Sequence, residues 1–160
     1  PITPSSIIAS RIFFVLGLTS AQSLAVLLIA ELIGVRLATG ILGIVLILLM
    51  GLLLGIGILS LSMALAFTLS GHGQFFSIIG FVTLPIIFAS TAFAPIQEMP
   101  GWLQSIAMLN PLTYAIEAVR SLVLAGFYWG FMIFTTLVLG LFDIVMFSVA
   151  VYAMRRAIEL

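Results

Sequence analysis

A long apolar run without any charged side chain, residues 41–70, is the feature that most constrains how this chain can fold. A helix needs about 20 such residues to cross a hydrocarbon core about 30 Å thick. The sequence as a whole is 64% hydrophobic and 6% charged, whereas a soluble domain carries about 25% charged residues. The apolar runs are also longer than the alternating segments of a membrane β-barrel. We therefore expect an all-α integral membrane protein.

About four transmembrane helices are predicted within a single domain that covers residues 1–160. They span residues 12–33, 41–70, 75–94 and 131–154. The second segment is longer than a perpendicular crossing needs, so it is expected to tilt or to extend beyond the hydrocarbon. Pro85 lies near the middle of the third segment and predicts a kink there.

The basic residues predict how these helices are oriented. Arg11 precedes the first span, and Arg155 and Arg156 follow the last. With four spans, these two basic ends of the helical region lie on the same side of the membrane. Because cytoplasmic loops carry an excess of basic residues, we expect that side to be cytoplasmic. A fifth crossing by residues 111–125 would separate the two ends, and its roughly 15 residues reach only about 22 Å. We therefore place residues 95–130 outside, as a re-entrant helical hairpin before the last span that lies in or dips into the outer leaflet.

The polar and small residues of the first two spans predict which faces meet other helices. Small or polar side chains at helical spacing allow close packing and face protein rather than lipid. In the first span they are Thr19, Gln22 and Ser23. In the second span they are Gly51, Gly55, Ser62 and Ala66, although ordinary use of glycine in membrane helices also explains this set.

Local residues predict where the second helix of the hairpin begins and ends. Asn110 is a suitable N-cap, Pro111 fits the first helical position, and Gly126 suits a C-terminal stop. Glu117 and Arg120 lie three residues apart and can pair on a polar stripe, which we expect to be the wet side of the helix. In the preceding helix, Trp102 is expected to anchor at the membrane interface. A plain interfacial loop with no role in transport remains the alternative.

The segment "MPGWLQSIAMLNPLTYAIEAVR" resembles the signature near the C-terminus of ABC type-2 transporter permeases. The residues that carry the resemblance are Pro100, Trp102, Asn110, Pro111, Tyr114, Glu117 and Arg120. The family comprises the membrane subunits of exporters for drugs, polysaccharides and lipid-linked glycans, including the daunorubicin-resistance permeases. The order of the spans and the outer element before the last span also agree with this family.

The start of the chain, "PITPSSIIASR", resembles the cytoplasmic loop through which such permeases contact their ATPase. This resemblance implies an ATPase-coupling loop at residues 1–11, with Pro1, Ile2, Thr3 and Arg11 as its matching residues. Family members usually have six spans, so the resemblance implies that the N-terminal spans of a longer protein precede this sequence. No signal-peptide pattern is visible at its start.

The resemblance implies the function of a permease subunit in an ATP-driven exporter. Its substrate would be amphipathic or hydrophobic, of the drug, lipid or polysaccharide class, and would leave the cytoplasm. The implied partners are a cytoplasmic ABC ATPase subunit, a second permease copy in a homodimer or heterodimer, and the lipid bilayer. The implied location is the cell membrane of a bacterium or archaeon, multi-pass, with a cytoplasmic C-terminus.

Asp143 lies near the middle of the last predicted span and is a candidate residue of the transport pathway. An ionisable side chain at that depth is costly, so its presence suggests a function. Thr136, Gly140 and Ala150 share its face, so we expect it to point into the bundle. A hydrogen-bonded packing residue is the alternative. If Asp143 coupled transport to an ion, the protein would be a secondary transporter instead.

Other chemistry is excluded by residue types. The sequence has no Cys, no Lys and one His, which leaves no Cys or His set for a metal site and no phosphate-binding G-x-x-x-x-G-K-[ST] loop. The sequence shows no catalytic nucleophile with a neighbouring general base, so it does not suggest an enzyme. It also shows no basic patch that would suggest a nucleic acid partner. We therefore expect no cofactor in this chain, with ATP and Mg²⁺ bound by the partner subunit. A membrane anchor that transports nothing is the remaining alternative.

Overall fold

The computed structural model describes residues 4–35, 37–69 and 71–158 of the 160-residue chain. All regular structure in these residues is helical, which confirms the predicted all-α fold. The helices are α1 (Pro4–Leu32), α2 (Gly40–Thr68), α3 (His72–Phe88), the 3₁₀ turn η1 (Ile96–Glu98), α4 (Gly101–Leu109), α5 (Pro111–Leu124) and α6 (Trp129–Ile158).

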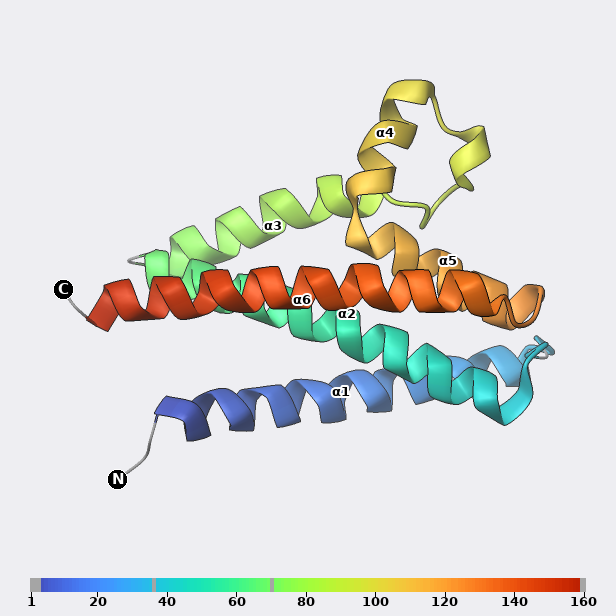
Figure 1. Cartoon of the computed structure of the whole chain (residues 1–160), viewed down its shortest axis with the longest axis horizontal. Coiled ribbons are helices and arrows are strands. Elements are labelled where there is room, and N and C mark those ends of the chain that lie inside the picture. The colour runs from blue at the N-terminus through green and yellow to red at the C-terminus, as the bar shows by residue number, and fades with distance from the viewer. Residues whose placement is uncertain (1–3, 36, 70, 159–160) are drawn as a thin grey trace.

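The long helices α1, α2 and α6 form the body of the molecule (Figure 1). α2 and α6 run in the same direction and α1 runs opposite to them, so the start of α1 and the end of α6 lie at one end. α3 starts beside the end of α2 and diverges from the bundle, α4 stands away from it, and α5 returns alongside α6. The connection from α1 to α2 and the one from α5 to α6 therefore lie together at the opposite end.

Among the described residues, three helices are long and apolar enough to cross a membrane: Ser10–Leu32, Gly40–Thr68 and Trp129–Ala157. The third span predicted from the sequence, residues 75–94, corresponds to α3, which has 17 residues and ends at Phe88. At about 1.5 Å per residue α3 reaches about 25 Å, less than the hydrocarbon core of about 30 Å. Neither a fourth full crossing nor the re-entrant character of the hairpin is therefore confirmed.

The early end of α3 has a local cause. Pro85 lies inside the helix and lacks the N–H group that would bond to a carbonyl one turn earlier. The helix continues for less than one further turn. The N–H of Ala89 then bonds to the carbonyl of Pro85 at 2.8 Å, and the N–H of Ser90 bonds to that of Ile87 at 3.2 Å.

α1 also differs from its predicted start. Residues 1–11 were expected to form a loop, but α1 begins at Pro4, so Arg11 lies within a helix. Proline is favoured in the first turn of a helix, where its missing N–H has no partner to lose. Arg11 is exposed.

The core lies where α2, α5 and α6 meet. It consists of buried side chains from each of these helices: Ile47, Met50, Ala115, Ala118, Leu122, Met132 and Leu139. Three of the seven are contributed by α5, although α5 is the shortest of the three helices. α5 is therefore an integral part of the bundle, and the apolar side of its amphipathic pattern faces α2 and α6.

Glycines of α2 set two close helix contacts. A Cβ atom on Gly57 would overlap the ring of Phe142 and lie 2.6 Å from Asp143 Oδ1, so α6 can approach α2 only because Gly57 has no side chain. On α1, Thr19 and Ser23 contact Gly55 and Gly51, with 3.5 Å from each hydroxyl oxygen to the position of a Cβ atom. The predicted contact face is thus confirmed at these residues.

Gln22 departs from that prediction, because it is exposed. α1 packs mainly against α2, and one neighbouring helix covers only a narrow stripe of its surface. Thr19 and Ser23 lie on the stripe, and Gln22 lies beside it.

Candidate functional site

Asn110 joins two helix ends that come from different parts of the chain. Its Oδ1 accepts a hydrogen bond from the N–H of Leu112 at 3.0 Å and so caps α5, as predicted. Its Nδ2 donates to the carbonyls of Ile86 at 2.7 Å and of Ala89 at 3.1 Å, at the end of α3. Asn110 is 8% exposed. A single amide therefore satisfies the start of α5 and the end of α3, where water has little access.

Arg120 binds the segment that directly follows α3. Its Nη1 donates to Glu117 Oε1 in an ion pair, which confirms the pairing predicted from their spacing. Its Nη2 donates to the carbonyl of Thr91 at 2.7 Å. We call the hydrogen bonds of Asn110 and Arg120 to residues 86–91 the α3–α5 clasp.

The clasp changes the interpretation of the polar stripe on α5. The stripe was expected to be wet, but Thr113 is buried, and the side chains of Arg120 and Glu117 are only 32% and 30% exposed. On this side Arg120 bonds to Thr91, which follows α3 and is separated from Arg120 by 29 positions in the sequence. Such a contact leaves no periodic signal in the sequence.

Three other residues of the signature segment lie on α4 or next to it: Tyr114, Pro100 and Trp102. The hydroxyl of Tyr114 donates to the carbonyl of Met108 at 2.6 Å, and its ring packs edge-on against Phe134 with the ring centroids 5.8 Å apart. Pro100 directly precedes α4. Trp102 lies on α4 and is 68% exposed, a placement compatible with an interfacial anchor.

The far end of α5 is held by the connection between α1 and α2. The hydroxyl of Thr39 donates to the carbonyl of Leu122 at 2.7 Å, and the N–H of Ala38 donates to that of Val123 at 3.1 Å. Gly126 then ends the helix, as predicted, with φ of 109° and its N–H bonded to the carbonyl of Ser121 at 2.8 Å. Thr39 could not be predicted from the sequence, because nothing marks a residue 83 positions away as a partner of Leu122.

Asp143 points into the bundle, as the sequence predicted. It lies against Gly57 of α2, and its Oδ1 is buried without a hydrogen-bond partner among the described residues. Of the residues predicted to share its face, Ala150 is buried and the hydroxyl of Thr136 bonds to the carbonyl of Met132 in its own helix at 2.8 Å. The structure thus places Asp143 at the crossing of α2 and α6.

The predicted coupling residues are only partly described. Pro1, Ile2 and Thr3 lie outside the described residues. Arg11 is exposed on α1, and Arg155 and Arg156 are exposed in the last turn of α6. The start of α1 and the end of α6 lie at the same end of the molecule (Figure 1).

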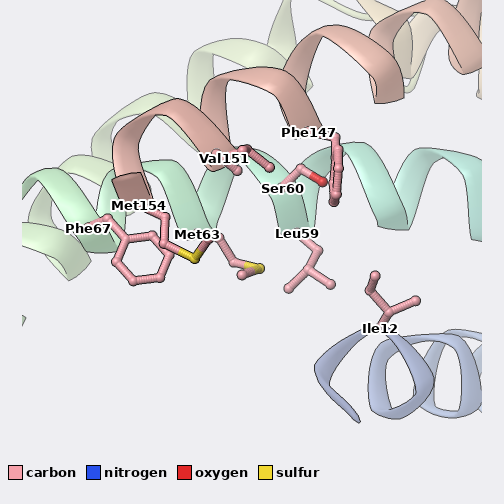
Figure 2. Close-up of a pocket in the computed structure, with 9 residues that line it drawn as sticks. Ile12, Leu59, Ser60, Met63, Phe67, Phe147, Val151 and Met154 are labelled. Carbon is pink, nitrogen blue, oxygen red and sulfur yellow. The ribbon is translucent and has the colours of Figure 1, made fainter. Parts of the chain in front are cut away.

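Two hollows of different character lie at opposite ends of the bundle. Figure 2 shows the first, where Ile12 of α1 faces side chains of α2 and α6 that include Leu59, Met63, Phe147 and Met154. Its volume is about 10 Å³, which is room for one water molecule and no ligand.

The second hollow, the α5–α6 cleft, has a volume of about 460 Å³. Its lining includes the Glu117–Arg120 pair together with Ser121, Leu124, Tyr128 and Phe131. Most of its walls are thus apolar. No group of three or more potential metal ligands occurs among the residues that the structure describes.

Comparison with known proteins gives one family. The model of the ABC-2 type transporter family matches residues 1–124, which include α1 to α5 and the whole clasp. A protein of Cyanophora paradoxa named "Putative transport permease ycf38" is 36% identical over 117 residues, which make up 73% of this chain and 40% of the relative. A protein of the same name from Porphyra purpurea is 58% identical over 60 residues, or 38% of this chain and 21% of the relative. This chain thus spans 40% or less of the length of these relatives. No solved structure matches it.

Proposed function

This chain belongs to the ABC-2 type transporter family, and from that premise we propose that it is part of a permease that exports an amphipathic or hydrophobic substrate at the expense of ATP. The observation that carries the proposal is the family match over residues 1–124. The three helices able to span a membrane agree with it. A transport permease of this family is a membrane component and not itself an enzyme.

ATP would be hydrolysed by a separate ATPase subunit, as membership of the ABC-2 type transporter family implies. The exposed Arg11 and the Arg155 and Arg156 pair support a cytoplasmic position for the end of the bundle where an ATPase subunit would dock. The proposed transporter also contains a second permease copy, in a homodimer or heterodimer.

The clasp supports a mechanical role for the outer segments. α3 has no buried side chain among its described residues and is joined by hydrogen bonds to α5 at its end. A movement of α3 would therefore be passed to α5 and to α4. In the proposed exporter this coupling lets the hairpin of α4 and α5 respond at the exit when ATP is bound at the other end.

The direct test compares cells with and without the full-length protein. Efflux of daunorubicin and of a fluorescent phospholipid, as probes of the drug and lipid classes, is measured before and after ATP depletion and after a protonophore collapses the proton gradient. The proposal expects export of at least one probe that stops on ATP depletion and continues with the protonophore. Export that continues without ATP would contradict it.

A second candidate is an ion-coupled secondary transporter that uses Asp143. The observation that favours it is the buried carboxylate oxygen without a partner at the crossing of α2 and α6. For this candidate, the protonophore stops export, ATP depletion does not, and Asp143→Asn abolishes it. The same assay therefore separates the two mechanisms.

A further inference from the structure

The side-chain hydrogen bonds between α5 and residues 86–109, the segment from the end of α3 through α4, all run in one direction. The donors belong to α5 and its N-cap: Asn110, Tyr114 and Arg120. The acceptors are main-chain carbonyls of the segment: those of Ile86, Ala89, Thr91 and Met108. Every residue has such a carbonyl. Attachment of the segment therefore depends on the three donor side chains, and little on the side chains of the segment itself.

Two of the donors are held in place by contacts that do not involve the segment. The Oδ1 of Asn110 accepts from the N–H of Leu112 at 3.0 Å, while its Nδ2 faces the segment. The ring of Tyr114 packs edge-on against Phe134 of α6, while its hydroxyl faces the segment. Both side chains therefore keep their position on α5 if the segment moves away.

Glu117 does the same for Arg120. Its carboxylate pairs with Nη1 of Arg120, and this pair orients the guanidinium so that Nη2 reaches the carbonyl of Thr91 at 2.7 Å. An isolated charge is costly inside a membrane. If the segment left, Arg120 would keep its ion pair, and only a hydrogen bond to a carbonyl would be lost. Leaving and returning therefore strand no charge.

The segment 86–109 adds no side chain to the core formed by the described residues of α2, α5 and α6. It has contacts of its own instead. The Nε2 of Gln104 donates to the carbonyl of Met99 at 2.8 Å, and the rings of Phe88 and Phe93 stack with their centroids 5.1 Å apart. A unit with few apolar contacts to its surroundings opens at a lower free energy than a packed core does.

We propose that Asn110, Tyr114 and Arg120 form a preorganised latch that releases and rebinds residues 86–109 while α2, α5 and α6 stay packed, with Glu117 as its positioning residue. When the latch is engaged, the segment moves with α5. When it is released, the two move separately. This inference rests on contacts within the chain, and it is independent of which substrate is exported and of whether ATP drives the export.

Hydrogen exchange of the full-length protein in detergent micelles tests the latch, with peptides from each helix read by mass spectrometry. In the unmodified protein, the helical N–H groups of α4 should exchange at least about tenfold faster than those of α6, because the segment opens without the bundle. Exchange of α4 at the same rate as α6 would mean that the two open only together, and would overturn the proposal.

Tyr114→Phe removes one donor of the latch and keeps the ring that packs on Phe134. It should raise the exchange rate of α4 about fivefold and leave α6 unchanged. Met108→Leu is the matched control on the acceptor side, because it keeps the carbonyl and changes a side chain that is 54% exposed. It should change nothing. An equal effect of the two variants, or no effect of Tyr114→Phe, would overturn the proposal.

Glu117→Ala tests the positioning role, because it leaves Arg120 and the carbonyl of Thr91 in place. Exchange at the end of α3 should rise about tenfold, with α6 unchanged. Glu117→Gln, whose side-chain oxygen can still accept from Arg120, should keep most of the protection. Glu31→Ala removes an exposed carboxylate of α1 and is the control. Unchanged exchange in folded Glu117→Ala protein, or an equal rise in every helix, would refute the role of Glu117.

Discussion

Two helix ends meet at Asn110, and each has backbone groups that are costly to leave unpaired away from water. An aspartate could cap α5 equally well but could not donate to the carbonyls of Ile86 and Ala89. The capping role of Asn110 follows from the sequence, because Asn-Pro before an amphipathic segment is a local pattern. Its bonds to α3 could not be predicted, because they depend on where the chain returns.

Replacing Asn110 by Ala should lower the free energy of unfolding of the full-length protein by about 2 to 4 kcal/mol. The loss combines a helix cap, worth about 1 kcal/mol, with carbonyls left without donors. Unfolding in mixed SDS micelles measures it. Asn110→Asp should keep the cap and still be destabilised. Gln97→Ala, at an exposed position next to the same segment, should change little, and equal effects at the two positions would show that the clasp contributes nothing.

Gly57 is another single residue on which the packing depends, because an added methyl group there would meet Phe142 and Asp143. We expect Gly57→Ala to destabilise the protein by about 1 to 3 kcal/mol, as overpacking in a close contact does. Gly80→Ala in α3 is the control, because no heavy atom lies within 4 Å of the added Cβ. Thermal unfolding midpoints of the two variants decide the matter, and a shift for Gly80→Ala as large as for Gly57→Ala would refute the close crossing.

Among the helices, α5 is the element whose position organises its surroundings. Asn110 and Arg120 join it to α3, and Thr39 joins it to the connection between α1 and α2. Its start and its end could be predicted from Asn110, Pro111 and Gly126. Its place against α2 and α6 could not, because the pattern shows that one face is apolar but not which helices cover it.

The far attachment of α5 is tested by Thr39→Val, which keeps the shape of the side chain and removes the hydroxyl. The carbonyl of Leu122 then loses its donor, and we expect a loss of about 1 to 2 kcal/mol. Thr83→Val is a control, since that hydroxyl bonds to the carbonyl of Ile79 within its own helix. Hydrogen exchange of α5 should rise in the first variant alone. Equal protection in both would mean that Thr39 does not hold the helix.

For the whole molecule, the apolar runs fix the class of protein, and the parity of the basic ends predicts its orientation. The length of α3 could not be read in the same way, because Pro85 ends it early while the apolar sequence continues to Ala94. The number of complete crossings therefore needs an experiment.

Single cysteines can report the orientation, because this chain contains no Cys of its own. In a cysteine-free full-length protein, Gln97→Cys should react with a membrane-impermeant maleimide added to intact cells. Ala157→Cys, at the end of α6, should react only after the membrane is opened. Labelling of both positions from the same side would contradict the predicted topology.

The central claim, that the chain is part of an ATP-driven permease, is tested most directly by ATP hydrolysis in the purified transporter. The full-length protein, purified from its native membrane and placed in proteoliposomes, should carry a vanadate-sensitive ATPase subunit with it. Arg11→Glu, which reverses the exposed charge at the start of α1, should reduce that association several-fold. Folded protein that carries no ATPase activity from its own membrane, while export in the same cells continues, would contradict the claim.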